Sequence, residues 1–329
     1  MTQDSATNPP LLAVEDLATH FNIRGGILSR VVGKVHAVDG VSFELHHGET
    51  LGLVGESGSG KSTLGKTIMR LVEPTSGSIR IEGQELVGLT KSELLPFRRN
   101  VQMVFQDPYS SLNPRIPVGK IVAEALKIHG VPDVEERENR VAEIFSKVGL
   151  HRADMRKYAN EFSGGQRQRI GIARALVLNP NLIIADEAVS ALDVSVQAQV
   201  INLLMDLQSD LGLSYLFIAH DLSIVAQICD RIAVMYMGEI VEIAPREELY
   251  SNPQHPYTKS LLASIPVSDP KKRIKKHRLI SGDIPSPSNP PTGCRFHTRC
   301  PIAEDQCKIE QPKLVELSQS HLAACRMIS

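Results

Sequence analysis

Residues 55–63 read GESGSGKST, a stretch that combines glycines with one lysine and several hydroxyl side chains. The spacing from Gly55 to Ser62 matches the pattern G-x-x-x-x-G-K-[ST]. Glycines let a backbone wrap closely around phosphate groups, while Lys61 can reach the β and γ phosphates and Ser62 can ligate Mg²⁺. The stretch therefore predicts a phosphate-binding loop for a triphosphate, formed by Gly55, Glu56, Ser57, Gly58, Ser59, Gly60, Lys61, Ser62 and Thr63.

Two adjacent carboxylates end an apolar run at residues 182–187, which read LIIADE. A buried parallel strand delivers such residues to the C-terminal edge of its sheet. There Asp186 would hold Mg²⁺ through water, and Glu187 would orient and polarise the water that attacks the γ-phosphate. Taken alone, Glu187 is better explained as a helix cap or surface carboxylate, but the phosphate-binding loop favours the catalytic interpretation.

A second glycine-rich stretch, EFSGGQRQRIG, occupies residues 161–171. Its Ser163, Gly164, Gly165 and Gln166 also suit phosphate binding through backbone N–H groups. One chain thus carries two stretches that fit the same kind of ligand, and the residues alone do not explain why.

The elements that must position these residues follow from the apolar pattern. Residues 50–55 are a continuous apolar run, typical of a strand buried on both faces, and they lead into helical spacing at Leu64, Ile68 and Leu71. Two further apolar runs, NLIIADE and LSYLFIAH, flank a helical pattern at 195–212. This alternation predicts an α/β fold with a parallel core sheet. The phosphate-binding loop and the two carboxylates together define that fold as a P-loop NTPase. Alternating stretches near the N-terminus predict antiparallel strands, and residues 115–160 predict mainly helices.

Composition divides the chain further. The first ten residues are polar and predict a frayed tail, and after Tyr250 the sequence becomes rich in proline and lysine. We expect a main domain at 11–245, with a helical subdomain at about 108–165, and a small irregular extension at 246–329. The basic run KKRIKKHR at 271–278 fits a solvated linker better than a lipid or nucleic-acid contact.

Charge and hydropathy exclude some functions. The formal net charge of −1 and the pI near 6.8 lack the broad basic field of a nucleic-acid binder, so no nucleic-acid partner is expected. No apolar run approaches the ~18 residues that span a bilayer, and the N-terminus has no signal-peptide pattern. We therefore expect a cytosolic chain that meets a membrane only through partners.

Four of the five cysteines, Cys294, Cys300, Cys307 and Cys325, have the spacing C-x5-C-x6-C-x17-C. A disulfide is disfavoured in a reducing cytosol, and zinc sites usually have tighter cysteine pairs. Four thiolates can also hold an iron–sulfur cluster, so the residues leave a cluster, zinc and free thiols open. The isolated Cys229 reads as a small buried apolar residue.

Several ordered motifs along the chain together resemble the nucleotide-binding subunit of an ABC transporter. Besides the two motifs above they are FSGGQ, the Gln106 of QMVFQDP, SALD at 190–193 and the His220 of IAHD. The resemblance implies that Gln106 contacts Mg²⁺ and the attacking water, that His220 contacts the γ-phosphate, and that Asp193 lies at a dimer interface. Phe21 falls where the family has an aromatic that stacks on adenine, although a core phenylalanine is nearly as well supported.

The resemblance also answers why there are two glycine-rich stretches. It implies that Ser163 and Gly165 face the γ-phosphate bound by the other subunit of a dimer, so that one chain supplies half of each of two sites. Two positions depart from the family pattern: Ala188 replaces a proline, and Phe162 replaces the commoner leucine. Neither change removes a catalytic atom.

Several stretches, including QDPYSSLNPR and NPQHPYTKSLLASIP, resemble the peptide and oligopeptide importer branch, nearest to its F-type subunit. This implies ATP and Mg²⁺, a homologous D-type ATPase subunit, two membrane-spanning permease subunits and an extracytoplasmic solute-binding protein, at the cytoplasmic face of a bacterial inner membrane. It also implies a [4Fe–4S] cluster on the four clustered cysteines. Similar chains serve importers of nickel, glutathione, opines or oligosaccharides, so the solute stays open.

Two other classes of function fit less well. A soluble ABC ATPase that acts on DNA or ribosomes generally has two nucleotide-binding domains, a coiled coil or basic insertions, and none of these is evident here. A non-hydrolysing regulatory or iron–sulfur protein would have little reason to keep Lys61, Asp186, Glu187 and His220.

Overall fold

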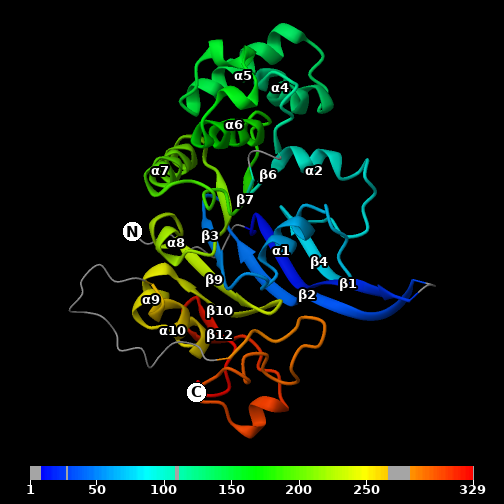
Figure 1. Ribbon diagram of the computed structural model, residues 1–329, viewed down its shortest axis with the longest axis vertical. Helices are drawn as coiled ribbons and strands as arrows, with labels where there is room; N and C mark the ends of the chain where they lie inside the picture. Colours follow the sequence, from blue (N-terminus) through cyan, green and yellow to red (C-terminus); the bar gives the residue numbers. More distant parts are fainter. Residues whose placement is uncertain (1–8, 27–28, 108–110, 266–281, 329) are drawn as a thin grey trace. The chain divides into compact units, whose positions relative to one another are not determined.

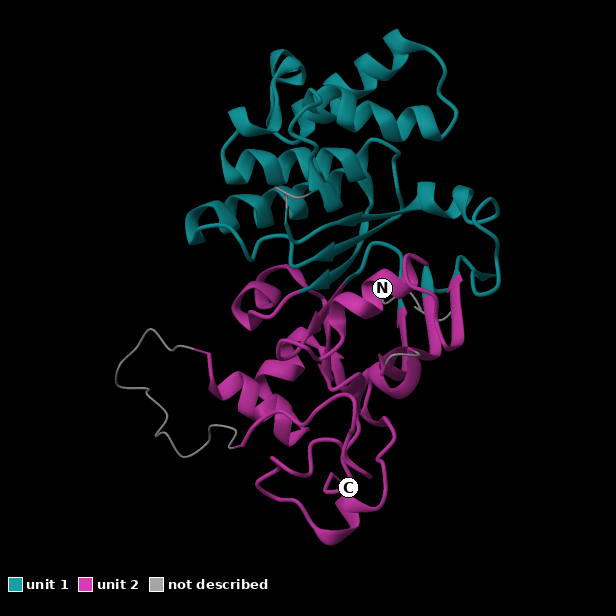
Figure 2. Ribbon diagram, turned by 45° about the vertical axis from the view of Figure 1, so that its right-hand side comes forward, with its two compact units in different colours: residues 1–12, 45–50, 81–218 teal, residues 13–44, 51–80, 219–329 magenta. Residues whose placement is uncertain are grey.

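The computed structural model describes residues 9–26, 29–107, 111–265 and 282–328 (Figure 1). Most of the predicted N-terminal tail and the whole basic run 271–278 lie outside these residues. The chain divides into two compact units, coloured separately in Figure 2. Unit 1 comprises Met1–Leu12, Leu45–Thr50 and Ile81–Ile218, and unit 2 comprises Ala13–Glu44, Leu51–Arg80 and Ala219–Ser329. The domain limits drawn from the sequence stay a prediction, because this division follows contacts rather than chain order.

Unit 1 contains a parallel sheet in the order β6-β7-β8. Its strands are short and apolar, and β7 and β8 are buried along their whole length, as expected for strands covered on both faces. The parallel pairing confirms the strand–helix–strand pattern read from the sequence. The strands are β6 (Val101–Val104), β7 (Leu182–Asp186) and β8 (Ser214–Ile218), and the short β5 (Gln84–Glu85) precedes them.

Three helices of unit 1, those that follow Asp133, Ser163 and Asp193, bury an apolar face and begin at a residue whose side chain caps them. The side chain of Asp133, for example, accepts the N–H of Glu136 at the start of α5, which buries Val141, Ile144 and Phe145. Figure 1 shows α4, α5 and α6 as neighbours. The helices are α2 (Leu95–Asn100), α4 (Val118–Ile128), α5 (Val134–Lys147), α6 (Gly164–Leu176) and α7 (Val194–Leu211), with 3₁₀ turns η1 (Arg152–Arg156) and η2 (Ala159–Glu161).

Unit 2 begins with a sheet in the order β2-β1-β4. Only four residues separate β1 from β2, so these neighbours form an antiparallel hairpin, as predicted. The buried strand β3 then leads into α1, which ends at Ile68, so Leu71 lies beyond the helix and is half exposed. These elements are β1 (Leu12–Gly25), β2 (Arg30–Leu45), β3 (Thr50–Val54), α1 (Lys61–Ile68) and β4 (Ser76–Ile81).

A second sheet of unit 2 joins β3 to the C-terminal part of the chain. Strand β3 pairs parallel with β9, and the order continues antiparallel through β10, β12 and β11. The extension is thus less irregular than predicted, because its two short strands continue a sheet. The elements are α8 (Leu222–Ile228), β9 (Arg231–Tyr236), β10 (Glu239–Pro245), α9 (Arg246–Ser251), α10 (Pro256–Ala263), η5 (Asp305–Lys308), β11 (Val315–Ser318) and β12 (His321–Ala323).

Among the described residues, the helices are all too short or too polar to cross a bilayer. Cys229 is fully buried, and a Cβ added to Gly52 would lie 2.8 Å from its sulfur. Burial also raises the pKa of the Cys229 thiol, which agrees with its prediction as an apolar core residue.

Candidate functional site

The phosphate-binding loop, residues 55–63, connects β3 to α1 in unit 2. Two of its glycines are required by close backbone contacts at positive φ. A Cβ on Gly55, with φ of 155°, would lie 2.1 Å from the carbonyl oxygen of Met235, and one on Gly60, with φ of 105°, would lie 2.0 Å from that of Ala37. A side chain at either position would therefore clash with the backbone, so both glycines are needed for the loop conformation.

Lys61 is buried at the first position of α1. Its ammonium group donates to the carbonyl oxygens of Gly55 (2.8 Å) and Glu56 (3.0 Å), so its charge lies inside the curve of the loop. Gly60 precedes the helix and has no side chain to cap it, and the first N–H groups of the helix carry a positive partial charge. A buried cation beside a helix start is an arrangement that suits phosphate oxygens.

Two more predicted nucleotide contacts lie in unit 2. Phe21 is on β1 with 43% of its surface exposed, which rules out the alternative of a core phenylalanine. His220 is exposed beyond the end of β8 and is followed by Asp221, whose carboxylate caps α8. Both side chains are therefore accessible to a ligand.

Unit 1 holds the two predicted carboxylates at the C-terminal end of β7. Asp186 is 3% exposed, while Glu187 follows it with a positive φ of 48°, uncommon for a residue with a side chain. The Gln106 amide donates to Glu187 Oε2 at 2.6 Å, so the structure brings these two predicted catalytic residues together. Ala188, in the family's proline position, is buried.

The stretch FSGGQ starts α6 in unit 1 with a reciprocal cap. The Ser163 hydroxyl accepts the N–H of Gln166 (3.3 Å), and the Gln166 side chain accepts the N–H of Ser163 (3.0 Å). A Cβ on Gly165 would lie 2.4 Å from Val196 of α7, whereas one on Gly164 would meet only Leu192 at an ordinary 3.6 Å. Packing against Val196 therefore requires a glycine at position 165, whereas packing alone does not require one at position 164.

Asp193 caps α7 by accepting the N–H of Val196 at 3.0 Å. The Ser195 hydroxyl also donates to this carboxylate, and together these hydrogen bonds lower the pKa of Asp193. An exposed, ionised cap is a sufficient local explanation for this residue. Its predicted place at a dimer interface stays a prediction.

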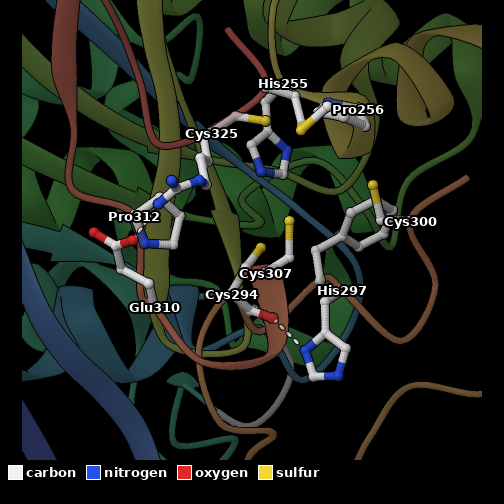
Figure 3. A pocket seen from close by; sticks show the side chains of 12 residues that line it. His255, Pro256, Cys294, His297, Cys300, Cys307, Glu310, Pro312 and Cys325 are labelled. Atoms are coloured by element: carbon white, nitrogen blue, oxygen red, sulfur yellow. Dashed lines mark hydrogen bonds and ion pairs between the residues drawn. The ribbon is translucent and has the colours of Figure 1, made fainter. Parts of the chain in front are cut away.

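The four clustered cysteines converge in unit 2, although their sequence spacing is wide. Cys294, Cys300, Cys307 and Cys325 line one cavity, and Figure 3 shows their side chains around it together with His255 and His297. Burial raises the pKa of the Cys294 thiol to about 11, and repulsion by the other three thiolates adds to this shift. The structure brings the four predicted side chains to one cavity, and their binding of a metal or cluster stays a prediction.

Motif reasoning missed the residues that hold the phosphate-binding loop from outside. The Tyr257 hydroxyl accepts the N–H of Glu56 at 2.9 Å, and Arg299 pairs with the Glu56 carboxylate at 2.7 Å. Hydrogen bonding to Glu56 raises the pKa of Arg299, so the Arg299 guanidinium stays protonated. No short sequence signal marks these partners, because they lie about two hundred residues or more from Glu56.

Motif reasoning also missed a cluster on the N-terminal strands of unit 2. His20, His36 and Asp39 have potential ligand atoms within 4.8 Å of one another. Burial acts to raise the pKa of Asp39, but hydrogen bonds from His20, Arg295 and His36 outweigh it, so the pKa is lowered. Because Arg295 already supplies a cation to Asp39, the cluster is explained without a metal ion.

Comparison with known proteins matches two family models. Residues 38–190 match the model described as ABC transporter, and residues 241–307 match the oligopeptide/dipeptide transporter, C-terminal region. The oligopeptide transport ATP-binding protein AppF of Bacillus subtilis is 52% identical over 99% of both chains. This chain belongs to the ATP-binding subunits of ABC transporters.

Solved structures of ABC cassettes agree with this membership. One is the ATP-binding cassette MJ0796 in a dimeric post-hydrolysis state bound to ADP and Pi, with a TM-score of 0.63 and 28% identity over 71% of this chain and 98% of that one. Another is cbiO1 from Clostridium perfringens, part of the ABC transporter complex cbiONQ, with a TM-score of 0.63 and 26% identity over 74% and 91%. This ABC subunit is therefore an ATPase that uses ATP and Mg²⁺.

Proposed function

We propose that this ABC subunit hydrolyses ATP to drive the import of peptides across a bacterial inner membrane. The observation that carries the proposal is the full-length similarity to AppF, which includes the C-terminal region described for oligopeptide and dipeptide transporters. That region separates this branch from cassettes that share only the ATP-binding part. Nickel, glutathione, opines and oligosaccharides are the alternative solutes.

In the proposed reaction, Lys61 and the N–H groups of the phosphate-binding loop bind the β and γ phosphates. Ser62, Gln106 and Asp186 would hold Mg²⁺, which neutralises charge that develops on the phosphates. Glu187 orients and polarises the attacking water, and His220 contacts the γ-phosphate. The hydrogen bond between Gln106 and Glu187 supports this assignment, because it links the proposed metal ligand to the proposed base.

We propose that Ser163 and Gly165 complete the site of a partner subunit, a homologous D-type ATPase. Binding of ATP would close the pair and hydrolysis would reopen it, moving two permease subunits between inward and outward states. An extracytoplasmic binding protein would deliver the peptide. The subunit would then lie peripherally on the cytoplasmic face of the membrane.

A groove in unit 1 supports a permease contact. It has a volume of about 910 Å³ and lies between α4, the start of α5 and η1. Basic residues outnumber acidic ones along it, so we propose that it receives an acidic or amphipathic cytoplasmic helix of a permease subunit. The charged residues that line it are Lys120, Lys127, Arg137, Arg152 and Arg156, with Glu124 and Glu138 opposing them.

The test of the catalytic assignment is the ATP turnover of the assembled complex with Glu187→Gln. We expect turnover to fall at least about 100-fold, because the amide cannot polarise the attacking water, while ATP binding persists. Glu143→Gln removes a carboxylate from an exposed ion pair on α5 and should leave the rate unchanged. Equal rates for wild type and Glu187→Gln would refute the assignment.

The partners and the solute are tested by purifying the subunit from detergent-solubilised membranes. We expect it to bring two permease subunits and a D-type ATPase, and we expect mass spectrometry to identify peptides on the cognate binding protein. Recovery with ribosomes or DNA in place of permeases would contradict a transport role. Recovery of a metal, glutathione, an opine or a sugar would keep the transport role and replace the substrate.

We further propose that the four clustered cysteines hold a [4Fe–4S] cluster, for which four converging thiols are a suitable donor set. Four sulfurs around one zinc ion would lie about 3.8 Å apart, given a Zn–S bond of about 2.3 Å. Among the described residues, however, no three of these sulfurs lie within 4.8 Å of one another. The cavity measures only about 20 Å³, so a cluster would have to push the sulfurs further apart.

Anaerobic purification tests the cluster. We expect a visible absorbance band and about four iron atoms per chain, as four thiolates can hold a [4Fe–4S] cluster. Cys307→Ser should remove both, whereas Cys229→Ser, at the buried core cysteine, should keep the iron content. A colourless sample with zinc, or with neither metal, would overturn the proposal in favour of a zinc site or free thiols.

A further inference from the structure

Two buried arginines are direct neighbours of the clustered cysteines in the chain. Arg295 follows Cys294, and Arg299 precedes Cys300. The side chains are 9% and 7% exposed, so both point into unit 2 rather than into solvent. Burying a guanidinium is costly unless carboxylates receive it, and both have such partners.

Arg299 binds the phosphate-binding loop. Its Nη1 lies 2.7 Å from Glu56 Oε2 and its Nη2 lies 3.2 Å from Oε1, which is the two-pronged geometry of a strong Arg–carboxylate pair. The guanidinium also lies 5.9 Å from the ring centre of Tyr236. The pair fixes the carboxylate of the loop's second residue and neutralises its charge close to where phosphates would bind.

Tyr257 holds the same loop residue through the backbone, since its hydroxyl accepts the N–H of Glu56. Its ring packs against Tyr236 (4.6 Å between ring centres) and Phe296 (5.4 Å). Phe296 is 1% exposed and lies in the chain between Cys294 and Cys300. An aromatic cluster thus connects the cysteine cavity to the loop.

The three contacts meet on one residue. The carbonyl oxygen of Glu56 accepts from the ammonium group of Lys61, its N–H is held by Tyr257, and its carboxylate is held by Arg299. A shift of the cysteine-bearing segment would therefore move the backbone that positions Lys61. Because three separate contacts reach the same loop residue, we expect them to act on the loop and not only on the overall stability of unit 2.

We propose that Arg299 and Tyr257 are positioning residues for the phosphate-binding loop, so that nucleotide affinity depends on the state of residues 294–325, the four-cysteine region. The inference rests on the proposed role of the loop in ATP binding. Because coupling between two sites is reciprocal, nucleotide binding must in turn stabilise the four-cysteine region. A chemical change at the four cysteines would then change the affinity of the ATP site for nucleotide.

Equilibrium binding of a fluorescent ATP analogue to the full-length chain tests the proposal. We expect Arg299→Gln to weaken binding about tenfold, within the range typical of coupled sites, and Arg299→Lys to weaken it less. The matched control is Lys308→Gln, which removes a cation from an exposed ion pair of the same region and should not change affinity. Circular dichroism and a thermal melt check that each variant is folded.

A double-mutant cycle with Glu56→Gln tests whether the two residues act together. The Arg299→Gln and Glu56→Gln effects should not add in the double variant, because each change breaks the same pair. Glu56→Gln also keeps the proposal testable from the other side if Arg299→Gln does not fold. Unchanged affinity in the folded single variants, or fully additive losses, would overturn the inference.

Hydrogen exchange supplies a readout independent of affinity. Addition of ATP analogue should slow exchange in peptides from residues 294–307 of the wild type, but not in Arg299→Gln at a saturating concentration. If the wild type bound no nucleotide at all, the proposed function would fail. If the wild type bound nucleotide without any change in these peptides, only the inference would fail.

Discussion

At the scale of single residues, exposure decides what the residue type alone leaves open. Phe21 fits both a core position and an adenine platform by sequence, and its 43% exposure excludes the core position, while the adenine role stays a prediction. Cys229 reads as a core residue, and it is buried. The secondary structure around such residues was predictable, because their neighbours along the chain define a strand or a helix. Whether each one faces solvent depends on elements that pack against it from elsewhere in the chain.

We predict that Phe21→Ala weakens ATP binding by about tenfold, because stacking of a base on an aromatic ring contributes about 1–3 kcal/mol. Phe21→Tyr should retain the affinity, since it keeps the ring. The free energy of unfolding should change little in either variant, as the side chain is 43% exposed. Isothermal titration and denaturant unfolding check the two effects, and a variant that loses stability but not affinity would contradict the adenine role.

At the scale of elements, strands and helix caps were predictable from the sequence, whereas contacts between segments far apart in the chain were not. The apolar run before residue 55, the strand ending in Asp186 and the helix after Asp193 all have the predicted form, because strands and caps depend on near neighbours. The pair between Arg299 and Glu56 joins positions 243 residues apart, and no local pattern encodes it. The continuation of the sheet into β11 and β12 was missed for the same reason.

The 3₁₀ turn η1 gives a pH-dependent prediction at this scale. The Asp154 carboxylate accepts from Lys157 (2.7 Å) and from the N–H of His151 (2.9 Å), and these hydrogen bonds lower its pKa. We expect Asp154→Ala to reduce the free energy of unfolding by about 1 kcal/mol at pH 7, as for the loss of a cap. Asp305→Ala, at a carboxylate that is 94% exposed, is the control and should have little effect.

The pH dependence follows from the direction of the shift. The ordinary pKa of 3.8 applies to the unfolded chain, and the folded pKa lies below it. The contribution of Asp154 to stability is therefore fully present above about pH 5 and is lost as the pH falls through the folded pKa. The difference between wild type and Asp154→Ala should therefore shrink between pH 4 and pH 2 or so. Urea unfolding at several pH values measures it, and a difference that stays constant below pH 4 would show that the charge is irrelevant.

At the scale of the whole molecule, the predicted site residues fall in both units. Unit 2 holds the phosphate-binding loop, Phe21 and His220, while unit 1 holds Gln106, the FSGGQ stretch and the two carboxylates of β7. Motif order in the sequence was enough to recognise these parts, because each motif is local. The identity of the partner ATPase and the solute stay open in the sequence, because these motifs concern only the nucleotide.

The FSGGQ stretch tests the dependence on a partner. Gly164 has room for a side chain within its own unit, since an added Cβ meets only Leu192 at 3.6 Å, whereas Gly165 is closed by Val196 at 2.4 Å. We therefore expect Gly164→Asp to fold and to bind nucleotide as an isolated subunit with affinity close to wild type. In the assembled complex it should lower ATP turnover about 100-fold, because a carboxylate would face the phosphates held by the partner.

Ser146→Asp is the matched control, because it places the same new carboxylate on an exposed position of α5 and should leave turnover unchanged. Analytical ultracentrifugation with ATP and the catalytically slow Glu187→Gln background would show whether Gly164→Asp blocks association of the pair. If Gly164→Asp instead impaired nucleotide binding by the isolated subunit, the stretch would act on its own chain. The argument for a partner subunit would then lose its support from Gly164. It rests on Gly164 because packing within unit 1 does not require a glycine at that position.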